Sequence, residues 1–194
     1  MFPPDFTGPV LKTATARCAA ESIANLAPAR RAVVQAGGCS GLWPLVLAMH
    51  FERVYTFEPA PTNFECLRMN IADTPTISAF AGALGATSRY VGMTRPKPKA
   101  GLWRVEGEGD IPMVALDHFL GDVAVDAIVL DVEGSEVSAL QGAVRLIDAY
   151  RPLLWFEAIH NTDALEAFVA AHGYTRPARG MGGDCYSVHT SRVH

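Results

Sequence analysis

The sequence lacks the paired cysteines that mark a disulfide framework or a structural zinc site. Its 194 residues include four cysteines, which are scattered along the chain and form no C-x-x-C pair. Structural zinc sites need closely spaced cysteines, and disulfide-rich folds need cysteines at spacings that allow pairing. We therefore expect free thiols in a reducing compartment, which predicts a cytoplasmic protein.

The chain also lacks an excess of positive charge and a long apolar run. Its formal net charge is −4, whereas proteins that hold nucleic acid through its phosphates carry basic patches. No apolar run approaches the ~20 residues of a membrane-spanning helix, and the N-terminus MFPPDFTGPV lacks the order of a signal peptide. These absences disfavour nucleic-acid and membrane partners. A homodimer stays open, and a small-molecule or glycan acceptor is what the family resemblance described below implies.

What the chain has is a regular alternation of apolar runs and helical stretches. Its length suits a single domain over residues 1–194 with a sizeable core. Apolar β-rich runs predict strands and apolar spacing of three and four predicts helices. The expected strands are residues 32–34, 54–57, 76–80, 113–116, 127–130 and 153–156, with a terminal hairpin from 173–176 and 185–189; the expected helices are residues 12–26, 42–50, 61–71, 135–147 and 163–172. This order predicts an α/β doubly wound sheet with a C-terminal antiparallel hairpin.

Two regions stand outside this alternation. Residues 1–30 form a lead-in followed by a helix. Residues 87–112 are rich in Arg, Lys, Pro and Gly and predict an inserted basic loop or hairpin. Long insertions of this kind often cover a binding site, and Trp103 beside Arg104 favours a role that faces the substrate. A solvated loop without a function is the alternative.

Residues 31–59 combine a strand, a glycine-rich turn, a helix, a second strand and an acidic residue. The turn contains Gly37, Gly38 and Gly41, and Glu58 ends the second strand. Glycines let a ligand approach the backbone, and a carboxylate at this spacing accepts from ribose hydroxyls in nucleotide-binding folds. A tight connection without a ligand is the alternative. The turn fits the dinucleotide fingerprint poorly, which favours a methyl donor without phosphate over NAD.

Several carboxylates follow the later strands. Asp131, Glu133 and Glu136 come after the strand at 127–130, and Glu157 ends the next one. In an open α/β sheet, ligands bind beyond the carboxyl ends of the strands, so these groups are candidates for base work or metal binding. Glu136 alternatively only complements a helix dipole. His160 is a candidate partner of Glu157 in proton handling or a surface residue.

The chain resembles the FkbM family of S-adenosylmethionine-dependent methyltransferases, from about residue 33 to the C-terminus. The glycine loop QAGGCSG, the segment YTFEPAPTNFECLRMNI and AGALG carry part of the resemblance. The more distinctive part is VALDHFL followed by DAIVLDVEGSEVSALQGA and then LLWFEAIH. The resemblance implies a class I methyltransferase (Rossmann-like) fold, with S-adenosylmethionine as the cofactor and hydroxyl groups of sugars or other small molecules as acceptors.

The resemblance also implies roles for individual residues. The glycine loop would hold the amino-acid part of the donor, Glu58 its ribose, and residues near Ala83 and Leu84 its adenine. Asp131 and Glu133 would lie near the methyl group. The full set expected to bind the cofactor is Gln35, Gly37, Gly38, Cys39, Gly41, Glu58, Pro59, Ala83, Leu84 and Asp131. The expected catalytic residues are Asp131, Glu133 and Glu157, any of which could be the base.

Two positions depart from the family pattern. Gln35 stands where an acidic residue is common, and Val129 stands where a lysine is common. These departures motivate an alternative, a module that binds S-adenosylmethionine without catalysis and acts in regulation or assembly. A third hypothesis is that the protein is a small NAD-dependent oxidoreductase. No metal site is predicted, although a divalent ion on the carboxylates is an alternative way to lower the pKa of the acceptor hydroxyl.

Overall fold

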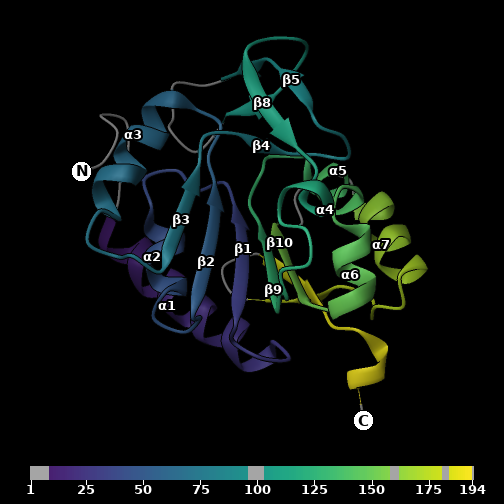
Figure 1. Ribbon diagram of the computed structural model, residues 1–194. Coiled ribbons are helices and arrows are strands. Elements are labelled where there is room, and N and C mark those ends of the chain that lie inside the picture. Colours follow the sequence, from purple (N-terminus) through teal and green to yellow (C-terminus); the bar gives the residue numbers. More distant parts are fainter. Residues whose placement is uncertain (1–8, 96–102, 158–161, 181–183, 194) are drawn as a thin grey trace.

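A seven-stranded sheet forms the centre of the computed structural model, which describes residues 9–95, 103–157, 162–180 and 184–193 (Figure 1). Its strand order is β11-β12-β10-β9-β1-β2-β3. The strands are β1 (Ala32–Ala36), β2 (Arg53–Phe57), β3 (Ile77–Phe80), β9 (Ala127–Leu130), β10 (Leu153–Glu157), β11 (Ala178–Arg179) and β12 (Asp184–Ser187). The first five are parallel to one another, whereas β12 runs antiparallel to both β10 and β11. This is the predicted doubly wound sheet with its terminal antiparallel hairpin.

Helices cover both faces of this sheet (Figure 1). Helices α1 (Pro9–Leu26), α2 (Leu42–Leu47) and α3 (Pro61–Asn70) lie on one side. Helices α4 (Leu116–Phe119), α5 (Glu136–Gln141), α6 (Val144–Tyr150) and α7 (Thr162–Ala171) lie on the other. A short 3-10 helix, η1 (Thr190–Arg192), closes the described chain. Among the described residues, no helix is long and apolar enough to cross a membrane.

The central strands are largely apolar because both faces of the sheet are covered. Strand β1 is buried at all five positions. Successive side chains point to opposite faces, so Val33 joins the core beneath α1 and α2 whereas Val34 joins the core beneath α5 and α6. Ile128 and Val129 of β9 divide in the same way. The buried runs therefore hold two helical layers on one sheet.

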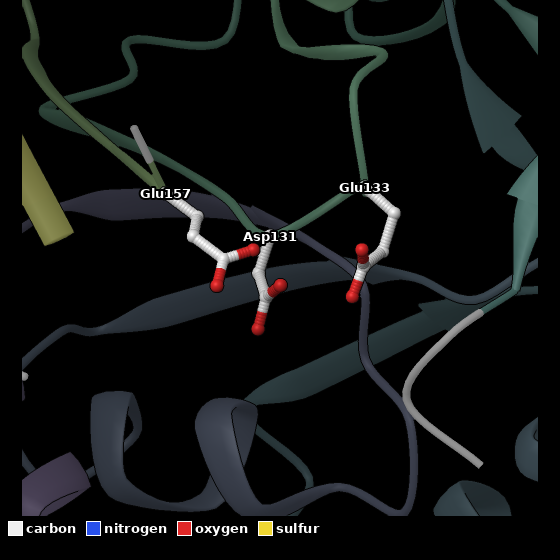
Figure 2. Close-up of side chains that lie close together, drawn as sticks. All are labelled: Asp131, Glu133 and Glu157. Atoms are coloured by element: carbon white, nitrogen blue, oxygen red, sulfur yellow. The ribbon is translucent and has the colours of Figure 1, made fainter. Parts of the chain in front are cut away.

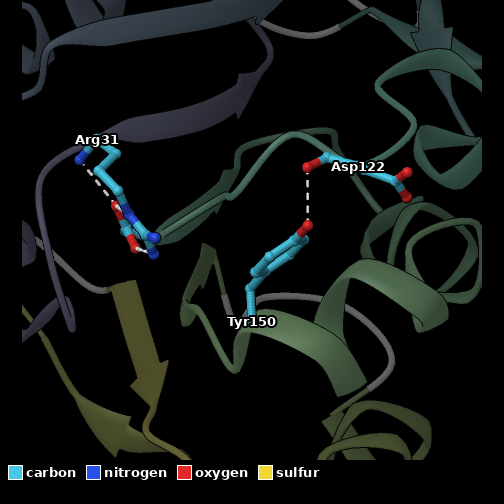
Figure 3. Close-up of polar contacts among 4 residues, drawn as sticks. Arg31, Asp122 and Tyr150 are labelled. Carbon is cyan, nitrogen blue, oxygen red and sulfur yellow. Dashed lines mark hydrogen bonds and ion pairs between the residues drawn. The ribbon is translucent and has the colours of Figure 1, made fainter.

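The amino edge of the sheet carries a buried ion pair next to β9. Asp126 is fully buried and accepts hydrogen bonds from the backbone N, Nε and Nη2 of Arg31, at 2.8, 3.1 and 2.5 Å. Nearby, the Tyr150 hydroxyl donates to the carbonyl oxygen of Asp122 at 2.7 Å; Figure 3 shows both contacts. They join the start of β1 to β9 and α6 to the loop before β9.

The described residues of the insertion, 87–95 and 103–112, include several short strands. Strands β4 (Ala83–Leu84), β5 (Arg89–Val91) and β8 (Ile111–Val114) form one small sheet, and β6 (Met93–Thr94) pairs with β7 (Arg104–Val105) in a hairpin. Of the two predicted forms, the hairpin is the one observed. In Figure 1 this region lies beyond the carboxyl ends of β1, β2 and β3.

The helix predicted over residues 135–147 is wrong, because the chain forms two helices with a break at Gly142. A Cβ at Gly142 would lie 2.0 Å from the carbonyl oxygen of Gly85, so the chain that follows β4 packs directly against the break. Asp117 completes it by accepting from the backbone N–H groups of Arg145 and Leu146 at 2.8 and 3.0 Å. These carboxylate contacts satisfy amide groups at the start of α6.

Other predicted boundaries shift by a few residues. The helix predicted to reach residue 50 ends at Leu47, and the strand predicted over 113–116 is β8, which ends at Val114 before α4 begins. The strand predicted over 173–176 is wrong: Tyr174 forms only an isolated bridge with His189, and the hairpin is made by β11 and β12 instead.

Candidate active site

A pocket of about 600 Å³, which opens partly to solvent, lies at the carboxyl ends of the central strands. The pocket lies beyond the ends of the neighbouring strands β1 and β9, where the strand order of the sheet reverses. Doubly wound sheets bind their ligands at this switch point. It is lined by Ala36, Gly37, Cys39, Phe57, Glu58, Pro59, Asn63, Gly82, Ala83, Leu84, Met93, Trp103, Val105, Asp131, Val132, Glu133 and Ser135.

The glycine loop after β1 is held close to the neighbouring strands. The N–H groups of Gly37 and Gly38 both donate to the carbonyl oxygen of Phe57 at 3.0 Å. Gly37 has a φ of 87°, and a Cβ there would lie 1.9 Å from the carbonyl oxygen of Asp131. Glycine is therefore required at Gly37 for its conformation and for the approach of β9.

Glu58 connects the glycine loop to the start of α3. Its Oε2 accepts from the backbone N of Cys39 at 2.7 Å, and its Oε1 accepts from the backbone N of Ala60 at 2.8 Å and from Asn63 Nδ2 at 3.4 Å. Burial raises the pKa of Glu58, and these three donors oppose that rise. Glu58 lines the pocket as the ribose hypothesis requires, and it also fixes the position of Cys39.

Three carboxylates meet at one side of the pocket, and they come from two strand ends. Asp131, Glu133 and Glu157 each place a carboxylate oxygen so that all three oxygens lie within 4.8 Å of one another. Figure 2 shows the three side chains pointing in the same direction. Asp131 follows β9 and Glu157 ends β10, so parallel pairing of these strands brings together residues that are far apart in sequence. Oxygens at this spacing could also hold a single divalent cation.

Asp131 has the most perturbed environment of the three. Burial raises its pKa to about 8, and the charges of Glu157, Glu133, Asp184 and Glu136 act in the same direction. Glu133 has a positive φ of 52° and lies 3.8 Å from Arg104, measured from Oε2 to Nη2. A titratable group with a pKa near neutrality in a pocket is typical of acid–base catalysis.

The structure gathers most of the predicted site residues into this pocket. Gly37, Cys39, Glu58, Pro59, Ala83, Leu84, Asp131 and Glu133 all line it. Four predicted residues are not among its lining residues: Gln35, Gly38, Gly41 and Glu157. Glu157 nevertheless places a carboxylate oxygen within 4.8 Å of those of Asp131 and Glu133. His160 lies outside the described residues.

Gln35 and Val129 point into the protein interior. Gln35 is fully buried; its Oε1 accepts from the Thr56 hydroxyl at 2.5 Å and its Nε2 donates to the carbonyl oxygen of Ala36 at 3.0 Å. Val129 packs in the core on the side of Trp155. Neither position that departs from the family pattern lines the pocket.

Glu136 has a local role that differs from dipole complementation alone. It is buried, and its Oε1 accepts from the backbone N of Gly134 at 3.2 Å. This contact stabilises the turn that carries Glu133, since Gly134 follows it with a φ of 102°.

Sequence reasoning missed several residues that line the pocket. Asn63 sits in the first turn of α3 and donates to Glu58; its position shortly after the acidic residue was the available signal. Phe57, Gly82, Val132 and Ser135 adjoin predicted residues in sequence and line the pocket with them. Met93 and Val105 lie in the insertion, and no local pattern marks them.

The strand order, the switch-point pocket and the terminal antiparallel hairpin define a class I, Rossmann-like methyltransferase fold. The sequence matches the profile described as the methyltransferase FkbM domain over residues 35–176. The chain therefore belongs to the FkbM methyltransferase family. Comparison with curated protein sequences finds no match to this chain.

Solved structures support the fold. An FkbM methyltransferase from Methylobacillus flagellatus KT is 23% identical with a TM-score of 0.59, and the match covers 82% of this chain but 43% of that protein. Magnesium protoporphyrin IX methyltransferase from Synechocystis PCC 6803, solved with bound SAM, is 10% identical with a TM-score of 0.52, covering 93% and 79% of the two chains. An rRNA methylase from Streptococcus thermophilus is 14% identical with a TM-score of 0.52, covering 87% and 90%. This chain thus spans less than half the length of the FkbM structure.

Proposed function

We propose that this protein transfers a methyl group from S-adenosylmethionine to a hydroxyl oxygen of a sugar or another small molecule. The observation that carries the proposal is the convergence of the glycine loop, Glu58 and the carboxylates Asp131 and Glu133 on a single pocket. Membership of the FkbM methyltransferase family supports the same reaction class.

The pocket fits a donor that has an amino-acid part, a ribose and an adenine. Its walls combine backbone at Gly37 and Gly82 with the apolar side chains of Phe57 and Leu84 and with carboxylates. Such a mixture of apolar surface and a few polar groups is typical of small-molecule sites. The glycine loop and Glu58 would hold the donor, and Ala83 and Leu84 would flank its adenine.

When bound, the donor supplies an electrophilic methyl group on a sulfonium. The bond from carbon to the acceptor oxygen forms as the bond from carbon to sulfur breaks, and the hydroxyl proton must leave. Asp131 is the best placed of the three carboxylates to take it, because it lines the pocket and has a pKa of about 8. Burial is the main cause of this raised pKa, and the negative charges of Glu157 and Glu133 add to it. The remaining barrier is lowered by positioning.

Calorimetric titration with S-adenosylmethionine, S-adenosylhomocysteine and NAD tests the donor. We expect binding of the first two and none of NAD. Gly37→Ala should abolish binding, because its Cβ would collide with the carbonyl of Asp131. Gly121→Ala is the matched control, since Gly121 also has a positive φ of 58° but a Cβ there meets nothing within 4 Å. NAD binding, or unchanged donor binding by Gly37→Ala, would contradict the proposal.

The alternative of a binding module without catalysis rests on Gln35 and Val129, which occupy positions where the family pattern has charged residues. Release of S-adenosylhomocysteine in the presence of a panel of hydroxylated acceptors separates the two functions. Tight donor binding with no turnover across the panel would favour the module. Repeating the assay with EDTA and then Mg²⁺ tests the cation alternative at the carboxylates, because a metal-assisted transfer would stop with EDTA and recover with the ion.

A further inference from the structure

The β6–β7 hairpin of the insertion has one apolar face. Met93 and Val105 are directly paired across the hairpin, and Trp103 lies two residues before Val105, so these side chains share a face. All three line the pocket. The other face carries Thr94, whose hydroxyl donates to Glu106 Oε2 at 2.7 Å. The hairpin therefore places Met93, Trp103 and Val105 in the lining of the pocket.

Two contacts fix the position of this apolar face. Arg104, which follows Trp103 in the chain, reaches Glu133 at 3.8 Å and so holds the hairpin at the carboxylate side of the pocket. The guanidinium of Arg95 lies over the Trp103 ring at 5.1 Å from its centroid, a cation–π arrangement that restrains the indole. The residue that follows Trp103 is thus tied to Glu133, one of the three carboxylates at the pocket.

We propose that Trp103, supported by Met93 and Val105, selects the methyl acceptor by stacking against a hydroxylated ring whose hydroxyl points to the carboxylates. This inference rests on the proposed function and names the acceptor class of the same site. The shared chemistry is a ring with a flat apolar face, which an aromatic alcohol or a sugar can supply. An acyclic polyol lacks such a face.

The physical basis is the shape and rigidity of the two partners. An aromatic side chain offers a large flat apolar surface with few rotatable bonds. A ring buries its face against that surface without losing internal freedom, whereas an open-chain polyol must be ordered on binding. Arg104 and Arg95 keep the wall in place before the acceptor arrives, so little is lost in ordering the protein.

Ligand-detected NMR titration of the protein loaded with S-adenosylhomocysteine tests this assignment. The probes are catechol, methyl α-D-glucopyranoside and glycerol. We expect at least one ring probe to bind and glycerol to bind at least about tenfold more weakly. Trp103→Ala should weaken the ring probe at least about tenfold, and Trp103→Phe should restore it to within about threefold. Binding of catechol alone identifies an aromatic acceptor, and binding of the glucoside alone identifies a sugar.

The matched control is Tyr90→Ala, which removes an exposed aromatic side chain from β5 outside the pocket lining. It should leave all three probes unchanged. Calorimetry of S-adenosylmethionine with each variant provides the second readout, and Trp103→Ala should stay within about threefold of the parent. The Phe variant keeps the test valid if the Ala variant folds poorly.

The outcomes are distinguishable. Absence of donor binding by the unmodified protein overturns the proposed function. Intact donor binding with no ring probe bound, or with glycerol bound as well as the rings, overturns the role of Trp103 alone. A tenfold loss of donor affinity in Trp103→Ala would assign the indole to the donor instead and would also overturn it.

Discussion

Two aspartates flank strand β9 and have opposite surroundings. Asp126, before the strand, accepts three hydrogen bonds from Arg31 and is fully buried. Asp131, after the strand, has the carboxylates of Glu157 and Glu133 as neighbours, and its pKa is raised to about 8. The same residue type is thus a paired structural group at one edge of the sheet and a crowded titratable group at the other.

This difference separates stability from function along one short strand. A buried carboxylate with a bidentate guanidinium is satisfied, and its loss is felt in folding. A carboxylate held among like charges costs folding energy, and such costs are concentrated at functional sites. The carboxyl edge of the sheet, and not its amino edge, is therefore where chemistry is expected.

The largest expected effect comes from Asp131→Asn. The nearly isosteric amide cannot take a proton, so methyl transfer should fall by about 10²–10⁴ while the dissociation constant of S-adenosylmethionine stays within about threefold. The measurement is S-adenosylhomocysteine release with an acceptor found in the panel. Asp126→Asn is the matched control and should keep its turnover per folded molecule. A loss of turnover below threefold in Asp131→Asn would exclude its role as the base.

Arg31→Met tests the contribution of the Asp126 ion pair to stability. It retains an apolar stem but leaves the Asp126 carboxylate without its guanidinium. Breaking a buried pair costs roughly 3–5 kcal/mol; we expect about 2 kcal/mol, because Arg31 is half exposed and its backbone N still donates. Urea unfolding measures it as a lower midpoint at constant slope. Arg89→Met, at an exposed site on β5, should change the free energy of unfolding by less than about 0.5 kcal/mol.

The fold was predictable because its signals are local. Each buried strand is a short apolar run, and the carboxyl ends of parallel strands necessarily share an edge, so Gly37, Glu58 and Asp131 were expected together. The break at Gly142 was not predictable, since it depends on contact with Gly85, which is distant in the sequence. The burial of Gln35 likewise depends on Thr56 of the next strand.

The glycine loop and the carboxylates of the site were predictable from the sequence. The lining residues that the insertion contributes were less so. Met93 and Val105 reach the pocket only because the insertion folds into a hairpin whose pairing puts them on one face. Trp103 could be suggested from its position beside Arg104 in the basic segment, but its place in the pocket lining and the contact between Arg104 and Glu133 are seen only in the folded chain. Contacts between remote segments, which no local pattern encodes, decide these details.

The pH dependence of stability should distinguish the two edges. The pKa of Asp131 is raised from 3.8 to about 8, so between these values the native state binds more protons than the unfolded state and stability falls as pH rises. Asp131→Asn removes this decline. With screening by solvent considered, we expect the variant to gain on the order of 1–2 kcal/mol relative to the parent between pH 5 and 8.5. Parallel urea-midpoint profiles for the two proteins would contradict the raised pKa.

A smaller effect is expected from Glu157→Gln. Burial is the main cause of the raised pKa of Asp131, and the charge of Glu157 is the next. Removing that charge should lower the pKa of Asp131, measured as the midpoint of the Asp131 carboxyl carbon in a ¹³C NMR titration assigned with Asp131→Asn. Glu65→Gln, on exposed helix surface, should leave the midpoint in place. An unchanged midpoint in Glu157→Gln would show that the charge of Glu157 does not contribute to the raised pKa of Asp131.

The smallest effect is expected from Tyr150→Phe, which tests how stability is distributed at the amino edge. The variant removes a hydroxyl that donates to the carbonyl of Asp122 at 2.7 Å in an exposed setting (Figure 3). Water can replace this bond, so the loss should be about 0.5 kcal/mol, well below that of Arg31→Met in the same urea assay. A cost equal to that of Arg31→Met would mean that the stability of this edge is shared among exposed contacts. The ion pair of Asp126 would then contribute no more to stability than an exposed hydrogen bond. Asp126 and Asp131 would in that case differ only in the pKa of their carboxyl groups.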